Sequence, residues 1–159
     1  MKIIKVALYK KSKTLFGRLI RLKQNLQWYA GRYSQYSHTE LVFEDGLFFS
    51  SSETDWWVRF KKIKPKKRNW DFIEIEITNS QYDKILKFCK SQENNNYNFT
   101  GIVLAQICNL NIKKDTEWFC SEITSRALQE ANLLCPYSSL FINPARLAKL
   151  LEESWKKIK

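Results

Sequence analysis

One cysteine and the only histidine of the chain are the residues that could carry chemistry together. Cys120 stands in EWFCSEITSR, and His38 stands in YSHTELVFEDG. A cysteine thiolate can attack a carbonyl carbon, while an imidazole takes the thiol proton and later returns it to the leaving group. The open alternative is structural, because cysteine is often a buried apolar residue and a lone histidine is often only hydrogen-bonded.

The predicted place of Cys120 favours the chemical role. Apolar residues follow Phe119 at helical spacing, which predicts a helix with Cys120 in its first turn. The unpaired backbone N–H groups at a helix N-terminus favour a thiolate. No comparable pattern accompanies the other three cysteines, and we expect these to be structural thiols: Cys89, Cys108 and Cys135.

His38 opens a predicted β-hairpin. HTELVF alternates as a strand, EDG supplies a turn in which Gly46 can adopt positive φ, and LFFSSS returns as a second strand. Centring the turn on Asp45 places Glu40 opposite Ser50, and leaves His38 and Ser50 as diagonal neighbours on one face.

The other segments complete an α+β pattern. We expect further strands in IIKVALYK, WWVRFKK and DFIEIEIT, together making one antiparallel sheet of four or five strands. Helices are predicted over residues 12–30, from a cap at Ser80 to Cys89, over 100–108, from Cys120, and after the Asn143–Pro144 pair. With 159 residues and 44% hydrophobic residues, we expect residues 1–159 to form a single domain in which the sheet packs against helices.

The two short motifs, with the histidine first and the cysteine last, resemble the circularly permuted papain-like hydrolases. These are the permuted NlpC-type amidases, including the YiiX-like group, and the related lecithin:retinol acyltransferase-like enzymes. The resemblance covers about residues 1–150, and its specific content lies in YSHTELVFEDGLFFSSS, WFCSEITSRALQ and Tyr97 to Gly101. It implies the fold of that family and a Cys-His dyad or Cys-His-polar triad that acts through an acyl-enzyme.

The resemblance also implies a role for each site residue. Cys120 matches the nucleophile, His38 matches the general base, and Ser50 occupies the position of the third residue, which orients the imidazole. Family members often carry Glu or His at that third position, so Ser50 is a departure, and a hydroxyl does not stabilise an imidazolium as a carboxylate does. Four residues are alternatives or secondary candidates: Ser52, Glu53, Glu40, which shares the strand face of His38, and Glu122, which follows the nucleophile.

Charge and aromatic residues suggest what the site binds. The chain carries a formal charge of +11, and the run from Arg59 to Arg68 holds seven basic residues in ten. Such a run is either a solvated sheet edge or a cationic rim for an anionic substrate or surface. The candidate substrate-binding aromatic residues are Trp56, Trp57, Tyr97 and Trp118.

Several function classes find no support. The sequence shows no RNA-recognition signature, zinc finger or confident helix-turn-helix, and we expect neither a metal site nor a cofactor. The amphipathic stretch from Leu15 to Leu26 faces either the core or an acidic membrane surface. Without a secretory signal or an apolar run of roughly 18–20 residues, we expect a cytoplasmic protein, with phage or host association left open.

Two hypotheses remain. The first is a cysteine peptidase or amidase that acts on a peptide, peptidoglycan or another isopeptide or acyl substrate; whether water or an alcohol accepts the acyl group stays open. The second is a noncatalytic binding module on the same fold, which holds an anionic polymer or lipid surface through its basic face.

Overall fold

The computed structural model describes residues 1–11, 18, 21–22, 25–26, 31–98, 117–135 and 142–155. Seven strands form one curled sheet in the order β5-β1-β2-β3-β4-β6-β7, and all neighbours are antiparallel except β6 and β7. The strands are β1 (Lys2–Tyr9), β2 (His38–Val42), β3 (Leu47–Ser52), β4 (Trp57–Lys62), β5 (Trp70–Ile77), β6 (Asn96–Tyr97) and β7 (Glu117–Trp118). The expected α+β class with an antiparallel sheet is confirmed, and the sheet has two short strands more than the highest expected count.

The β2–β3 hairpin forms as predicted. Leu41 pairs with Phe49 and Val42 with Phe48, while Gly46 takes φ 77° in the turn. That left-handed conformation strains residues with a Cβ, so glycine suits the turn. The register places His38 and Glu40 on one face of β2 and sends Leu41 to the other.

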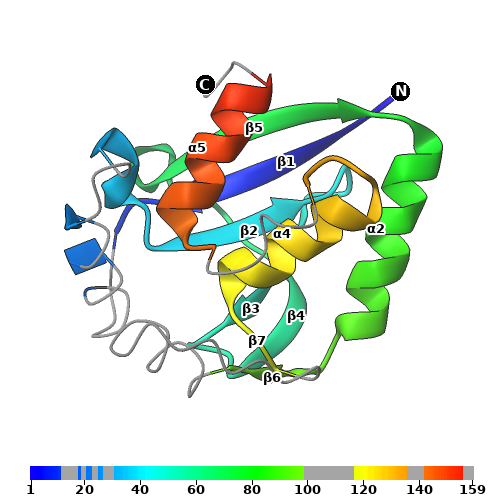
Figure 1. Ribbon diagram of the computed structural model, residues 1–159. Helices are drawn as coiled ribbons and strands as arrows, with labels where there is room; N and C mark the ends of the chain where they lie inside the picture. Colours follow the sequence, from blue (N-terminus) through cyan, green and yellow to red (C-terminus); the bar gives the residue numbers. More distant parts are fainter. Residues whose placement is uncertain are drawn as a thin grey trace.

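Three helices within the described residues cover one face of the sheet (Figure 1). They are α2 (Asn79–Gln92), α4 (Cys120–Glu130) and α5 (Pro144–Trp155). The cap of α2 is Thr78 rather than the expected Ser80: Thr78 and Gln81 exchange side-chain and backbone hydrogen bonds in a capping box. The predicted cap of α5 is confirmed, since the Arg146 amide donates to Asn143 Oδ1 at 2.8 Å.

The main core lies between this sheet face and the helices. Fully buried apolar side chains of the sheet contact those of α4, where Ile123 and Leu128 lie on the inner face. From the central strands the same core receives Leu41, Phe49 and Val58. The opposite sheet face carries only a small apolar cluster around Phe48 and Val42, and much of the rest of that face is polar.

Two expected helical stretches lie wholly or partly outside the described residues. The helix over 100–108 lies outside the described residues, as do Leu15 and Leu19 of the amphipathic stretch. Of that stretch, Leu22 and Leu26 are exposed rather than part of the core. Among the residues that the structure describes, no helix is long and apolar enough to cross a membrane.

Candidate active site

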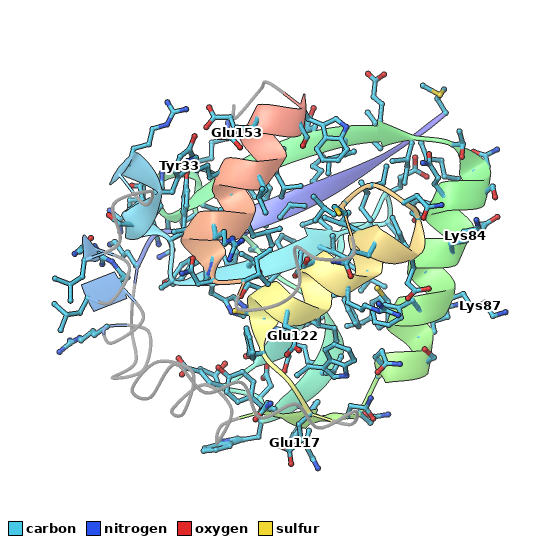
Figure 2. The ribbon with its side chains drawn as sticks, in the orientation of Figure 1. Tyr33, Lys84, Lys87, Glu117, Glu122 and Glu153 are labelled. Carbon is cyan, nitrogen blue, oxygen red and sulfur yellow. The ribbon has the colours of Figure 1, made fainter. Side chains whose placement is uncertain are left out.

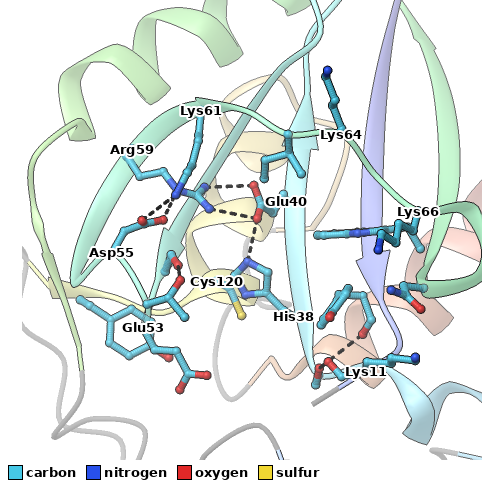
Figure 3. A pocket seen from close by; sticks show the side chains of 18 residues that line it. Lys11, His38, Glu40, Glu53, Asp55, Arg59, Lys61, Lys64, Lys66 and Cys120 are labelled. Atoms are coloured by element: carbon cyan, nitrogen blue, oxygen red, sulfur yellow. Dashed lines mark hydrogen bonds and ion pairs between the residues drawn. The ribbon is translucent and has the colours of Figure 1, made fainter. Parts of the chain in front are cut away.

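Cys120 and His38 line the same pocket, which has a volume of about 390 Å³. Each stands at the start of its element: His38 is the first residue of β2, and Cys120 is the first residue of α4. Figure 3 shows the Cys120 sulfur beside the His38 ring, on the side away from Glu40. The expected juxtaposition of the two residues is therefore present.

The segment before Cys120 is tied to the sheet. The Ser51 hydroxyl of β3 donates to the carbonyl oxygen of Trp118 at 2.6 Å, and the Asn98 amide donates to the same oxygen at 2.9 Å. Ser51 is fully buried. These bonds fix the chain two residues before the cysteine.

The first turns of α4 are held by buried hydroxyl groups as well. The Ser121 hydroxyl donates to the Ile142 carbonyl at 2.8 Å, and the Thr124 and Thr39 hydroxyls lie 3.3 Å apart. Thr39 adjoins His38, while Thr124 lies about one helical turn beyond Cys120. The contact between the two threonines therefore joins the histidine strand to the cysteine helix close to both site residues.

Glu40 binds the far side of the imidazole. His38 Nε2 lies 3.0 Å from Glu40 Oε1, which leaves Nδ1 as the ring nitrogen available to Cys120. Arg59 of β4 donates to both oxygens of the same carboxylate, at 3.0 and 3.1 Å. This two-pronged pairing fixes the plane of the carboxylate and hence the orientation of the ring.

Asp55 and Lys61 extend the network outward. Arg59 Nε donates to Asp55 Oδ2 at 2.8 Å, and Lys61 Nζ donates to Asp55 Oδ1 at 2.8 Å (Figure 3). Burial raises the pKa of Asp55, but its hydrogen bonds and charge interactions with Lys61 and Arg59 outweigh this and lower it to about 2. The guanidinium is thus held between two carboxylates.

Burial and charge act against each other in the inner part of the network. The side chain of Glu40 is only 3% exposed, and that of Arg59 is 10% exposed. Burial raises the pKa of Glu40, yet His38 and Arg59 lower it overall. Burial likewise lowers the pKa of His38, but the charge and hydrogen bond of Cys120 and the bond to Glu40 raise it to about 10. The arrangement therefore favours an imidazolium beside the cysteine sulfur.

Ser50 does not orient the ring, contrary to expectation. Its buried hydroxyl donates to the Thr39 carbonyl at 2.7 Å, and the Ser51 carbonyl oxygen lies 3.2 Å from the same hydroxyl. Ser50 pairs with Arg59 across the β3–β4 ladder, so its short side chain leaves room for the guanidinium to reach Glu40 on β2. Glu40, the second candidate, occupies the position at the imidazole.

Of the remaining acidic and hydroxyl candidates, two line the pocket and one does not. Glu53 and Ser52 line the pocket, although the Ser52 hydroxyl bonds with the Thr54 hydroxyl at 2.9 Å. Glu122 is buried in the first turn of α4, away from the pocket lining (Figure 2).

Only one of the four aromatic candidates lines the pocket. Tyr97 does so, and burial together with the negative charge of Cys120 raises its pKa. Trp118 is a core residue, and its indole N–H donates to Gln92 Oε1 at 2.9 Å. Trp56 and Trp57 are exposed outside the pocket lining.

The sequence alone did not reveal the Arg59 and Asp55 positions of the network. In the sequence Arg59 belongs to a basic run, and the signal that could have found it is its place on the strand that follows the hairpin. Two further pocket aromatic residues, Tyr9 and Trp70, were not among the expected substrate-binding residues; their rings lie 4.8 Å apart. Within the described part of the chain, no group of three or more His, Cys, Asp or Glu residues is arranged to hold a metal ion.

Comparisons with known proteins add no assignment. No protein-family model matches the chain, and no curated protein matches it either.

Proposed function

We propose that this protein is a cysteine hydrolase of the amidase or peptidase type, with Cys120 as nucleophile, His38 as general base and acid, and Glu40 as the residue that orients His38. The observation that carries the proposal is the chain of contacts Cys120–His38–Glu40–Arg59 at the wall of a pocket. The same division of labour between thiolate, imidazole and a polar partner recurs on unrelated folds.

The proposed reaction has two halves, acylation and deacylation of Cys120, and His38 transfers a proton in both. The Cys120 thiolate attacks the carbonyl carbon of an amide or ester, with its proton held on His38. The carbon–nitrogen or carbon–oxygen bond then breaks, and the leaving group takes the proton from His38. Water, or another acceptor, gives its proton to His38 and attacks the thioester carbon. The carbon–sulfur bond then breaks, which releases the acyl group on the acceptor and restores the Cys120 thiolate beside protonated His38. The backbone N–H of Cys120, at the start of α4, is our candidate donor to the oxyanion.

We further propose that the fold is that of the circularly permuted papain-like, NlpC-type hydrolases. Support comes from the order of the parts: a histidine at the start of a strand, a returning strand, and a cysteine at the start of a later helix. Peptide, isopeptide and peptidoglycan amides are the first substrates to screen on this basis, followed by acyl esters.

The test is the pH dependence of iodoacetamide alkylation of each cysteine in the folded protein, read by mass spectrometry. We expect rapid labelling of Cys120 well below pH 8, and its loss in His38→Ala. Two cysteines serve as internal controls: Cys89 is buried, which raises its pKa well above the usual value, and Cys135 is exposed. The proposal would be contradicted if Cys120 were labelled with the same pH dependence as Cys135 and at the same rate in His38→Ala as in the wild type.

A noncatalytic binding module is the second candidate. It is favoured by the charge of +11 and by basic residues of the same run that are exposed outside the pocket lining, namely Lys62, Lys67 and Arg68. It predicts salt-dependent binding of a polyanion, no hydrolysis, and no effect of Cys120→Ala on binding.

A further inference from the structure

One wall of the pocket is cationic. Lys11 follows β1, and Lys64 and Lys66 belong to the segment between β4 and the 3-10 helix η2 (Lys67–Asn69). All three are exposed pocket-lining residues. In Figure 3 they lie on one side of the Cys120–His38 pair, while Glu53 lies on the other.

No acidic residue of the described part of the chain forms an ion pair with these three lysines. The other two pocket cations are engaged, because Lys61 binds Asp55 and Arg59 binds Glu40 and Asp55. By contrast, no carboxylate of the described residues lies within ion-pair distance of Lys11, Lys64 or Lys66. A concave site lined by charges of one sign concentrates ligands of the opposite sign.

The backbone brings the three lysines together. The Lys10 amide donates to the Asn69 carbonyl at 2.9 Å, and the Asn69 amide donates to the Lys66 carbonyl at 2.8 Å. These bonds tie the chain next to Lys11 to the segment that carries Lys64 and Lys66.

The wall also has an apolar floor. Trp70 contacts Tyr9 with ring centroids 4.8 Å apart and Phe48 with centroids 6.0 Å apart, and Ile63 packs against the same cluster. Tyr9, Ile63 and Trp70 thus line the same pocket as the three lysines.

We propose that Lys11, Lys64 and Lys66 form a subsite for an anionic group, a carboxylate or a phosphate, on the substrate whose carbonyl is placed at Cys120. This inference rests on the proposed function and narrows it to acidic amides or esters. Ammonium groups bind both kinds of anion as point charges, so the wall does not require one particular anion geometry.

The experiment compares two small alkylating reagents of nearly equal size, the anion iodoacetate and the neutral iodoacetamide. The readout is the ratio of their alkylation rates at Cys120, with Cys135 as the exposed reference in the same sample. We expect the ratio at Cys120 to exceed that at Cys135. In the variant Lys11→Gln/Lys64→Gln/Lys66→Gln, this ratio should fall by about tenfold.

A matched control removes the same charge elsewhere. Lys84, Lys87 and Lys90 are exposed on α2 and lie outside the pocket lining, and Figure 2 shows Lys84 and Lys87 on that helix. Their triple change to Gln should leave the ratio as in the wild type. An unchanged ratio in the pocket variant, or an equal fall in the α2 variant, would overturn the subsite.

The same labelling reports the source of the anion. Slower iodoacetate labelling of Cys120 in inorganic phosphate assigns the subsite to a soluble anion. If vesicles of phosphatidylcholine with phosphatidylglycerol slow iodoacetate labelling of Cys120, while phosphatidylcholine vesicles and inorganic phosphate do not, the subsite is assigned to a lipid headgroup. Protection by neither counts against the subsite.

Failure of the subsite and failure of the proposed function are distinguishable. The reagent ratio can be measured even when Cys120 reacts slowly, whereas the proposed function depends on the loss of Cys120 reactivity in His38→Ala. A normal dependence on His38 with an unchanged ratio would remove only the subsite.

Discussion

The two faces of the central strands bury side chains of opposite character, apolar on one face and charged on the other. On the helix-covered face, Leu41, Phe49 and Val58 are buried in the main core. On the other face, Glu40 and Arg59 are almost as well buried, yet they are charged and bind each other. Apolar burial tolerates approximate fits, whereas a buried ion pair requires every partner in place.

The difference shows where the site obtains its rigidity. Glu40 of β2 is held by His38 of its own strand and by Arg59 of β4, which reaches it across β3. Removal of one group therefore leaves another buried charge without its partner. On the core face, removal of a side chain leaves a cavity and the remaining contacts persist. The charged face should therefore control reactivity, and the apolar face should control stability.

The largest contrast is expected between His38→Ala and Leu41→Ala. His38→Ala should lower the alkylation rate of Cys120 at neutral pH by about 100-fold or more, because the imidazole that takes the thiol proton is gone. Leu41→Ala should instead cost about 2–5 kcal/mol in the free energy of unfolding, because a fully buried side chain leaves a cavity. Urea unfolding and cysteine alkylation measure the two quantities, and equal reactivity losses in folded samples of both variants would break the comparison.

Arg59→Met should affect both stability and reactivity. Without the guanidinium, Glu40 remains buried with only His38 as partner, and we expect a loss of about 3–5 kcal/mol in the free energy of unfolding. The control is a double-mutant cycle with Glu40→Gln, in which the two losses should be less than additive. Strict additivity would mean that the pair is not coupled.

Asp55 should make stability depend on acid pH. Its folded pKa of about 2 lies below the ordinary value of 3.8, so its contribution to stability is present above pH 4 and disappears as the pH falls through about 2. We expect Asp55→Asn to flatten the stability profile in this range, by at most about 2 kcal/mol in the free energy of unfolding. An acid profile identical to that of the wild type would show that the Asp55 contacts are not maintained in solution.

Ser50→Ala should have the smallest effect. It removes a buried hydroxyl that binds the Thr39 carbonyl, which should cost about 1 kcal/mol, and it leaves Glu40 at the imidazole. The alkylation profile of Cys120 should therefore match that of the wild type. Loss of thiol activation in Ser50→Ala would restore the serine as the third member of the site.

Much of this architecture could be predicted because local patterns determine it. Alternation predicted the hairpin and the β1, β4 and β5 strands, and helical spacing placed Cys120 at the start of α4. Even the hairpin register followed from the turn, so the shared face of His38 and Glu40 was available from the sequence.

What could not be predicted depends on contacts between distant strands. Choosing Glu40 over Ser50 requires knowing that Arg59 pairs across Ser50 and reaches Glu40. The hydrogen bonds from Ser51 to Trp118 and from Thr39 to Thr124 likewise join segments far apart in the chain. Serine and threonine carry little periodic signal, so their role in fixing the cysteine emerges only from the fold.

The most direct measurement is an NMR titration of the His38 ring in the wild type and in Cys120→Ala. Because His38 is the only histidine, its ring signals are unambiguous. We expect an imidazolium at neutral pH that titrates near 10 in the wild type, and a clearly lower pKa in Cys120→Ala, because the negative charge of Cys120 is lost. Titration near the ordinary value of about 6.5 in both proteins would contradict the thiolate–imidazolium pair on which the account depends.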